Sequence, residues 1–551
     1  MKYLKYSIIL ALISFKGFSQ NSNQFSSQDD IYVKPKLVVG VVVDQMRYDY
    51  LTRFYTKYGD GGFKRLMNEG FNCKNNHFNY IPTKTAPGHA SIYTGTTPKG
   101  HGIIGNDWYD KTTKSSVYCA GDDSVNAVGT TSDAGKMSPH RMLTTTFSDE
   151  NRLFTQNQGK TIGISIKDRG AILPAGHTAN AAYWFHGKDE GVFISSTYYQ
   201  QELPKWVERF NASKTVKSYL KDWNTLYNIK TYTESGDDLN DFEHGFDGKE
   251  TATFPYDLKR LSKTNDGFDI LKTTPYGNSI VTDFAMEAIE GEDLGKDDIT
   301  DVLTVSYSST DYVGHNFGVN SKEVQDTYLR LDKELERFLK YLDKTVGEGQ
   351  YTLFLTADHG AVEVPAYLES QHIPAGYFNK KEFKTQLNEF MSSTFGASDL
   401  IENISNNQIF LDRAKLKAMK LDLSMVQDKI VKELEGYNYI YKVYAASTLV
   451  HQAFTSGIEE LLENGYNQKR SGDILYEFEP GVTSSGKKGS AHSTGLNYDT
   501  HVPLLFFGKG VKHGSTLQKT RIIDIAPTIS GLLGISFPNG ATGQPLEFVL
   551  K

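Results

Sequence analysis

Cysteine is scarce in this sequence: only Cys73 and Cys119 occur among 551 residues. Two thiols cannot build a disulfide scaffold, and they cannot supply a cysteine-rich zinc site. The count is compatible with one disulfide or with two free thiols, and export of the chain would favour the disulfide. A metal site in this protein would therefore rely mainly on ligands other than cysteine, such as carboxylate and imidazole groups.

An excess of positive charge is also missing. The 59 lysines and arginines are outnumbered by 66 aspartates and glutamates, which gives a formal net charge of -7. Such a chain has no overall attraction for nucleic acid or an anionic membrane, and the sequence contains no nucleic-acid-binding motif. An anionic substrate must therefore be drawn in by a local site.

Apolar runs long enough to cross a membrane are lacking as well. The basic start Met1–Lys5 is followed by an apolar run from Ser7 to Phe15 and by a small-x-small pattern at Gly17–Ser19. The run has about half of the ~20 residues that a span requires, and no comparable run follows. This pattern is typical of a secretory signal peptide. We expect a signal peptide over residues 1–19, a loose polar lead over 20–35, no later membrane span, and a periplasmic or secreted location.

What the sequence does contain is a set of mainly apolar, β-branched runs that lead to acids. Runs without polar alternation suit the central strands of a sheet that is covered on both faces. Ligands collect beyond the carboxyl ends of such strands, so acids there are well placed for chemistry. The runs are residues 36–43, 301–307 and 351–356, and the acids are Asp44, Asp311 and Asp358.

A helix is predicted between the last two runs. Apolar residues from Val324 to Leu342 recur at three- and four-residue spacing, and Asn320 with Glu323 can form the N-terminal cap. Strand, helix and strand in this order predict parallel strands with a right-handed crossover. Further strands are expected over residues 161–166 and 502–507, and a further helix over 522–533. The sequence thus predicts an α/β fold with a mostly parallel central sheet flanked by helices.

Two regions fit this alternation poorly. Residues 183–266 are rich in aromatics, glycine and acids, and residues 362–480 carry mixed helix and strand signals. Because strands typical of a core resume after each region, we interpret both as insertions that cap one domain spanning residues 36–551.

A hydroxyl nucleophile is predicted at Thr85. It lies in Thr83-Lys84-Thr85-Ala86-Pro87-Gly88-His89-Ala90, where a helix is expected from Ala86 to Tyr93. A threonine hydroxyl is a poor nucleophile at neutral pH and needs a neighbouring base or a metal. Thr85 can also be read simply as the N-cap of this helix. Both readings can hold together, because a helix N-terminus favours a bound anionic group.

Six Asp and His residues can supply the metal. Asp311 and His315 are four residues apart, so a helix would place both on one face. Each residue alone also has an ordinary reading as a helix cap, a turn acid or a loop histidine. Together they suit two zinc ions with three ligands each, since a metal pair can stabilise both the attacking and the leaving oxygen of a displacement at phosphorus. The six candidates are Asp44, Asp311, His315, Asp358, His359 and His492.

In their order along the chain, these motifs resemble those of the alkaline phosphatase superfamily. The resemblance is to its threonine-nucleophile branch, which contains nucleotide pyrophosphatase/phosphodiesterases and PafA-type, phosphate-irrepressible alkaline phosphatases. It implies the fold predicted above and a phosphothreonine formed on Thr85. It also implies that one zinc is held by Asp311, His315 and His492, and the other by Asp44, Asp358, His359 and Thr85.

The resemblance also bears on the substrate. In the PafA-type pattern the equivalents of Asn106, Lys167 and Arg169 contact the phosphoryl oxygens, which suits the dianion of a monoester. From the residues alone, Lys167 and Arg169 can equally be a solvated strand end paired with acids such as Asp168. The resulting prediction is an exported, two-zinc alkaline phosphatase of broad specificity that acts on small phosphate monoesters. The alternatives are a phosphodiesterase or nucleotide pyrophosphatase, and a non-catalytic phosphate-binding protein.

Overall fold

Strand β1 (Leu37–Val43) lies at the centre of the fold, and all seven of its residues are buried. The computed structural model describes residues 34–551. The predicted signal peptide over 1–19 lies outside the described residues, as does the predicted lead over 20–35 apart from its last two positions. No helix within residues 34–551 is long and apolar enough to cross a membrane.

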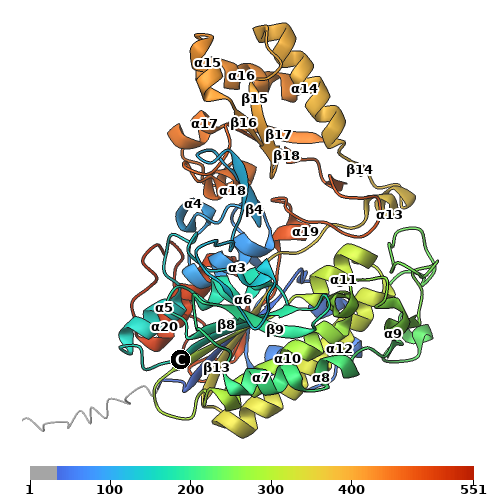
Figure 1. The fold of residues 1–551 in the computed structure, drawn as a ribbon, viewed down its shortest axis with the longest axis vertical. Helices are drawn as coiled ribbons and strands as arrows, with labels where there is room; N and C mark the ends of the chain where they lie inside the picture. Colours follow the sequence, from blue (N-terminus) through green and yellow to red (C-terminus); the bar gives the residue numbers. More distant parts are fainter. Residues whose placement is uncertain (1–33) are drawn as a thin grey trace, which may run out of the picture. The chain divides into compact units, whose positions relative to one another are not determined.

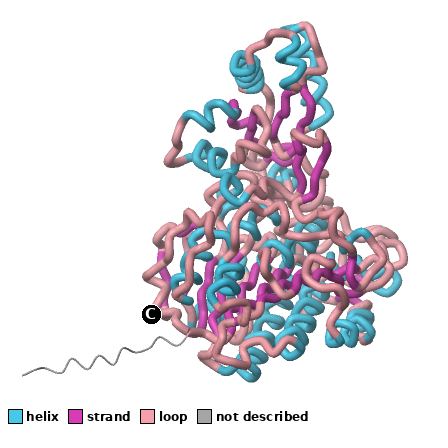
Figure 2. The backbone as a smooth tube through the Cα atoms, turned by 60° about the vertical axis from the view of Figure 1, so that its left-hand side comes forward, coloured by secondary structure: helices cyan, strands magenta, loops and turns pink. Residues whose placement is uncertain are grey.

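The central sheet contains ten strands (Figures 1 and 2). Its middle five strands are parallel, and antiparallel strands flank them on both sides. In spatial order the strands are β21 (Gly514–Thr516), β2 (Phe71–Cys73), β20 (Leu504–Gly508), β13 (Tyr351–Thr356), β1, β12 (Asp301–Tyr307), β7 (Thr161–Ser165), β8 (Ala181–His186), β9 (Val192–Ser196) and β6 (Ala127–Val128). The predicted α/β class and mostly parallel sheet are confirmed.

The parallel strands end level with one another. Val43 of β1 pairs with Tyr307 of β12, and Val42 pairs with Thr356 of β13. The predicted strand-helix-strand unit is present, but β1 lies between β12 and β13. This register places the residues that follow each strand at one edge of the sheet.

Helices cover both faces of the sheet (Figure 1). On one face α10 (Pro275–Gly291) packs against α12 (Lys322–Leu342) and α7 (Lys205–Ala212). On the other face α3 (Thr85–Thr94) packs against α6 (Asp168–Ala175), with α5 (Phe147–Phe154) and α20 (Ile525–Leu533) beside them. The predicted cap of α12 is one residue off, because the Ser321 hydroxyl, rather than Asn320, accepts the Val324 amide.

Residues 376–483 include a second, smaller α/β layer, which we call the cap (Figure 1). Its antiparallel sheet has the order β15 (Ile401–Ser405), β16 (Gln408–Leu411), β18 (Ile474–Phe478) and β17 (Ile440–Ala445). Helices α14 (Lys380–Phe395) and α16 (Leu423–Leu434) contribute to a separate apolar core with this sheet, in which Leu387 and Ile430 are fully buried.

Two sequence expectations differ from the structure. The region from residue 183 does not stand apart at its start, because β8 and β9 extend the central sheet and α7 packs on α10. The favoured disulfide is wrong, since Cys73 and Cys119 are free and belong to different apolar clusters. Burial raises the pKa of the Cys73 thiol to about 12, so this thiol stays protonated and unreactive.

Candidate active site

Four neighbouring parallel strands deliver charged residues to one edge of the central sheet. Asp358 follows β13, Asp44 follows β1, and Lys167 follows β7. Asp311 follows β12 within helix α11 (Ser309–Phe317). Because the strands end level, side chains that are far apart in sequence meet here, as expected for the carboxyl edge of a parallel sheet.

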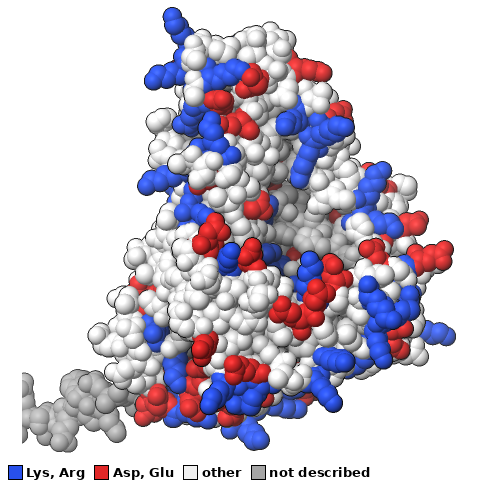
Figure 3. Space-filling model, viewed as in Figure 1, with Lys and Arg blue, Asp and Glu red and all other residues white. Residues whose placement is uncertain are grey.

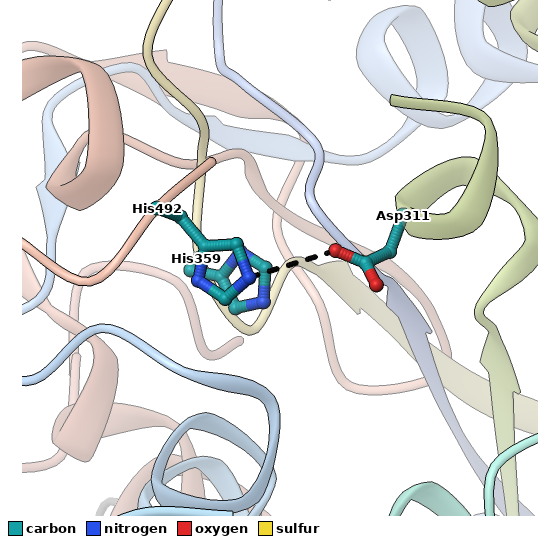
Figure 4. Close-up of side chains that lie close together, drawn as sticks. All are labelled: Asp311, His359 and His492. Carbon is teal, nitrogen blue, oxygen red and sulfur yellow. Dashed lines mark ion pairs between the residues drawn. The ribbon is translucent and has the colours of Figure 1, made fainter. Parts of the chain in front are cut away.

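The acids and histidines form two groups whose ligand atoms lie within 4.8 Å of one another. One group is Asp44, Asp358 and His359, and the other is Asp311, His359 and His492. Figure 4 shows Asp311 directed from α11 toward His359 and His492, whose rings stack with centroids 3.5 Å apart.

The second group differs from the ligand set that the resemblance implies, because it contains His359 in place of His315. His315 Nε2 lies 3.1 Å from Asp311 Oδ1, on the same face of α11, while His492 Nε2 lies 3.7 Å from that oxygen. All six predicted ligands are therefore brought together, but His359 is common to both groups and His315 stands beside the second one.

Backbone carbonyls orient three histidine rings. His315 Nδ1 lies 2.7 Å from the Ser490 carbonyl oxygen, and His492 Nδ1 lies 2.8 Å from that of Thr83. His359 Nδ1 lies 2.9 Å from the carbonyl oxygen of Gly360. A carbonyl only accepts, so each Nδ1 donates and a neutral ring keeps the Nε2 lone pair free, which is the usual arrangement of metal-binding histidines.

The site residues fit divalent cations. Asp44 Oδ1, Asp358 Oδ2 and His359 Nε2 are buried and have no hydrogen-bond partner within residues 34–551, while Asp44 Oδ2 is paired with the Lys167 ammonium. Burial and the nearby Asp358 carboxylate raise the pKa of Asp44 to about 7. Buried, unpartnered polar atoms are costly, and a cation bound among these oxygens and nitrogens would remove that cost.

Thr85 is the first residue of α3 rather than its N-cap, which is Lys84. The Thr85 side chain therefore does not cap the helix. Its Oγ1 accepts a long hydrogen bond of 3.5 Å from Lys167 Nζ. Gly88 lets this helix approach the backbone at Asp358, because a Cβ on residue 88 would lie 2.3 Å from the Asp358 carbonyl oxygen. His89 anchors the helix by pairing with the Thr85 carbonyl and with the Ser306 hydroxyl.

The Lys167 ammonium connects the Thr85 hydroxyl with both groups of candidate ligands. It lies 2.8 Å from Asp44 Oδ2 and 2.5 Å from Asp311 Oδ2, and the residue is 4% exposed. Burial alone would lower its pKa, but Asp311 and Asp44 hold the pKa above its ordinary value. A cation is thus fixed beside Thr85, and Lys167 is not the solvated strand end that the sequence also allowed.

Arg169 and Asn106 border the same site. Arg169 Nη1 donates to the Tyr118 hydroxyl at 3.0 Å, while its buried Nε has no partner within the described chain. Asn106 Oδ1 accepts the backbone amide of Ala86 at 2.9 Å. With its oxygen fixed in this way, the Asn106 amide nitrogen is left to donate elsewhere.

Two residues of the site were not assigned from the sequence. Gln45 donates from its backbone to Asp358 Oδ1 and from Nε2 to Asp311 Oδ1, at 3.1 and 2.6 Å, and so links carboxylates from both groups. Its adjacency to Asp44 was the only available signal. Tyr118, which donates to Asp168 and accepts from Arg169, lies at the end of a short strand and had no recognisable signal.

Comparison with known proteins identifies the family of the chain. The family model described as type I phosphodiesterase / nucleotide pyrophosphatase matches residues 38–503. The chain belongs to this family. The resemblance predicted from the motifs is thereby confirmed.

Relatives in this family extend over nearly the whole chain. Alkaline phosphatase PafA of Elizabethkingia meningoseptica is 47% identical over 94% of this chain and 95% of its own length. A protein of Myroides odoratus named calcium-transporting ATPase is 46% identical over 99% of both chains. The crystal structure of wild-type PafA superimposes with a TM-score of 0.91, at 46% identity, over 94% of this chain and 99% of that one.

Proposed function

We propose that the protein is an exported, zinc-dependent alkaline phosphatase that hydrolyses phosphate monoesters through a phosphothreonine at Thr85. The observation that carries the proposal is the position of the Lys167 ammonium. It touches the Thr85 hydroxyl and one carboxylate from each ligand group. Nucleophile, cation and ligands are therefore within reach of one phosphoryl group.

Two zinc ions would be held by the six ligands, Asp44, Asp358 and His359 on one side and Asp311, His315 and His492 on the other. Carboxylate and imidazole donors without thiolate suit catalytic zinc. Bound zinc would supply positive charge that stabilises the attacking and the leaving oxygen. His359, which is common to both groups, would be placed at the boundary between the two ions.

The chain's own residues would bind and orient the phosphoryl group. Thr85 Oγ1 would form a bond to phosphorus as the bond to the leaving alcohol breaks, and water would later release phosphate and restore the hydroxyl. Lys167, Arg169 and the Asn106 amide would bind the non-bridging oxygens. The N-terminus of α3, where Thr85 lies, would add its backbone dipole.

The positively charged side chains of Lys167 and Arg169 favour a monoester over a diester as substrate. A monoester presents a dianionic phosphoryl group, whereas a diester is a monoanion that needs room for a second substituent. The relative named alkaline phosphatase supports this substrate class. The relative named ATPase is compatible with it, because the terminal phosphoryl group of ATP is also unsubstituted.

A phosphodiesterase or nucleotide pyrophosphatase is the second candidate, since the matching family model carries that description. The decisive comparison uses purified protein on an aryl phosphate monoester and the matching diester, with chelator and with added zinc. We expect faster monoester turnover that chelator abolishes and zinc restores. Lys167→Ala with Arg169→Ala should remove most monoester activity, and Lys340→Ala, on an exposed helix face, serves as the control.

A faster diester reaction that is unchanged by the double variant would establish the second candidate instead. Export is tested separately, by expressing the full chain and measuring where the protein and its N-terminus are found. We expect a periplasmic or secreted protein that begins near residue 20.

A further inference from the structure

The tip of the cap reaches the site at Asn406. This residue and Asn407 form the two-residue turn between β15 and β16, with φ values of 52° and 55°. A turn with two positive φ angles matches the twist of a hairpin, and asparagine tolerates both positions. The turn is therefore a defined structure, and Asn406 has a fixed direction.

Asn406 bridges the two segments that carry Thr85 and Asn106. Its Oδ1 accepts from Lys84 Nζ at 2.6 Å, and its Nδ2 donates to the Asp107 carbonyl oxygen at 2.7 Å. Lys84 directly precedes the nucleophile, and Asp107 directly follows the amide donor. One side chain from the cap thus holds the immediate neighbours of both groups.

The backbone at Gly105 also lies close to the Asn406 side chain. A Cβ at Gly105 would lie 2.8 Å from Asn406 Nδ2, so glycine is what lets the cap turn approach the backbone next to Asn106. Asn106 is itself tied to the helix of Thr85 through the Ala86 amide. Asn406, Asn106 and the start of α3 therefore form a closed set of contacts.

The hairpin that begins after Asn106 packs on the cap as a whole. It consists of β4 (Asp107–Asp110) and β5 (Ser115–Tyr118), and Figure 1 shows β4 beside the cap sheet. The Tyr109 ring meets that of Phe410 edge to face at 5.2 Å, and Lys114 forms an ion pair with Glu402 at 2.5 Å. Figure 3 shows a hollow between the cap and the part below it, lined by side chains of both charges.

We propose that Asn406 is a positioning residue: through Lys84 and Asp107, the cap turn sets the placement of the Asn106 amide relative to the Thr85 hydroxyl. The inference rests on the proposed function, in which that amide binds a phosphoryl oxygen. The cap is then part of the phosphoryl-binding wall rather than only a cover. Misplacement of a binding group by about 1 Å costs up to ~10²-fold in rate, so a single side chain outside the site can matter.

The turn provides its own control. Asn406→Gly removes the bridging amide and keeps a residue that accepts positive φ. Asn407→Gly makes the same substitution at the next position, where the side chain bridges nothing. The Asn407 carbonyl accepts the Tyr476 amide, which glycine preserves, while its side chain makes no hydrogen bond to the described residues. Asn406→Asp keeps the acceptor toward Lys84 and loses the donor toward Asp107.

The experiment measures kcat and KM of the zinc-loaded, full-length protein on an aryl phosphate monoester, with thermal unfolding of each variant. We expect Asn406→Gly to lower kcat/KM about tenfold, mostly in kcat, below the ~10²-fold or more lost with a whole transition-state donor. Asn406→Asp should lose a similar amount, and Asn407→Gly should stay within about twofold.

A variant pair separates positioning from general damage. In an Asn106→Ala background, Asn406→Gly should cause less than about a twofold further loss, because the group it positions is gone. An equal loss in both backgrounds, a loss matched by Asn407→Gly, or wild-type activity in Asn406→Asp would each overturn the inference. Failure of the proposed function is distinct, since the unsubstituted protein would then hydrolyse the monoester more slowly than the matching diester, or not at all.

Discussion

Replacing Lys167 with methionine tests whether the ammonium holds the two groups of ligands together. Methionine keeps most of the length of the side chain and removes the charge. Two buried carboxylates, from Asp44 and Asp311, would then lose the cation that lies 2.8 and 2.5 Å away. We expect a large loss of stability in protein stripped of metal, and a loss of monoester turnover in protein loaded with zinc.

The size of the stability loss follows from these distances. At an effective dielectric constant of about 20, each contact is worth roughly 6 kcal/mol of Coulomb attraction. Most of that attraction is offset by the cost of burying the charges, and removal of one partner from a buried ion pair typically costs about 3–5 kcal/mol. We expect the free energy of unfolding of the chelated variant to fall by this amount.

The pH dependence has a definite sign. Because the folded-state pKa of Lys167 is raised above its ordinary value of 10.5, its contribution is fully present below that pH and is lost only as the pH rises further, through the folded pKa. An assay in mildly alkaline buffer therefore leaves the ammonium intact.

The assay is urea unfolding in the presence of chelator, followed by the same measurement with zinc. Zinc would neutralise the same carboxylates, so it should narrow the difference between variant and wild type. Lys340→Met is the control, because this lysine is 69% exposed and its pair with Glu336 should contribute under about 1 kcal/mol. A Lys167→Met loss no larger than that of the control would refute the reasoning.

Three further predictions concern the nucleophile, its helix and a buried acid. Thr85→Ala should reduce monoester turnover by at least ~10³-fold, and Thr85→Ser should retain measurable turnover, as read from initial rates and zinc content. Gly88→Ala should lower zinc affinity and activity by about 10–100-fold, because its Cβ would meet the Asp358 carbonyl at 2.3 Å and displace that ligand. Burial raises the pKa of Glu477 from 4.5 to about 8, so the folded protein keeps a proton that the unfolded chain loses and stability falls as pH rises through that window. Glu477→Gln should remove this slope and gain roughly 2–5 kcal/mol on wild type between pH 5 and 9, measured by urea unfolding.

Each of these predictions has a control and a contradicting result. Full turnover in Thr85→Ala would exclude the covalent route. Gly531→Ala, whose new Cβ would find no atom closer than 4.0 Å, should leave zinc binding unchanged, and an equal effect of both glycine variants would dismiss the steric argument. Glu479→Gln changes an exposed acid two residues away, and the same pH slope in that variant and in Glu477→Gln would show that burial of Glu477 is not its cause.

The central strands were predictable because a strand that is buried on both faces shows directly in the sequence as a run of mainly apolar residues. Every residue of β1, β12 and β13 is buried, so each strand reads as a mainly apolar run that ends near the site. Asp311 and His315 were also readable, since their spacing matches a helix turn and α11 supplies that helix. Local sequence and final structure agree wherever one element determines the outcome.

The remaining features depend on contacts between distant segments. Which histidine is shared between the two groups follows from the stacking of His359 on His492, and no spacing encodes it. Likewise, Asn406 was an ordinary turn residue until the cap brought it to Lys84. The two cysteines show the reverse case, in which a plausible pairing fails because each thiol is buried in a different cluster.

The candidate ligands lie between residues 44 and 492, on segments that come together at the sheet edge. During synthesis, therefore, the group of Asp311, His359 and His492 is incomplete until residue 492 has been added, late in the chain. If the chain crosses a membrane unfolded, as export by a signal peptide implies, it cannot carry its metals with it. The ions must then be acquired at the destination, and the supply of zinc outside the cell, rather than inside it, would set how much of the protein becomes active.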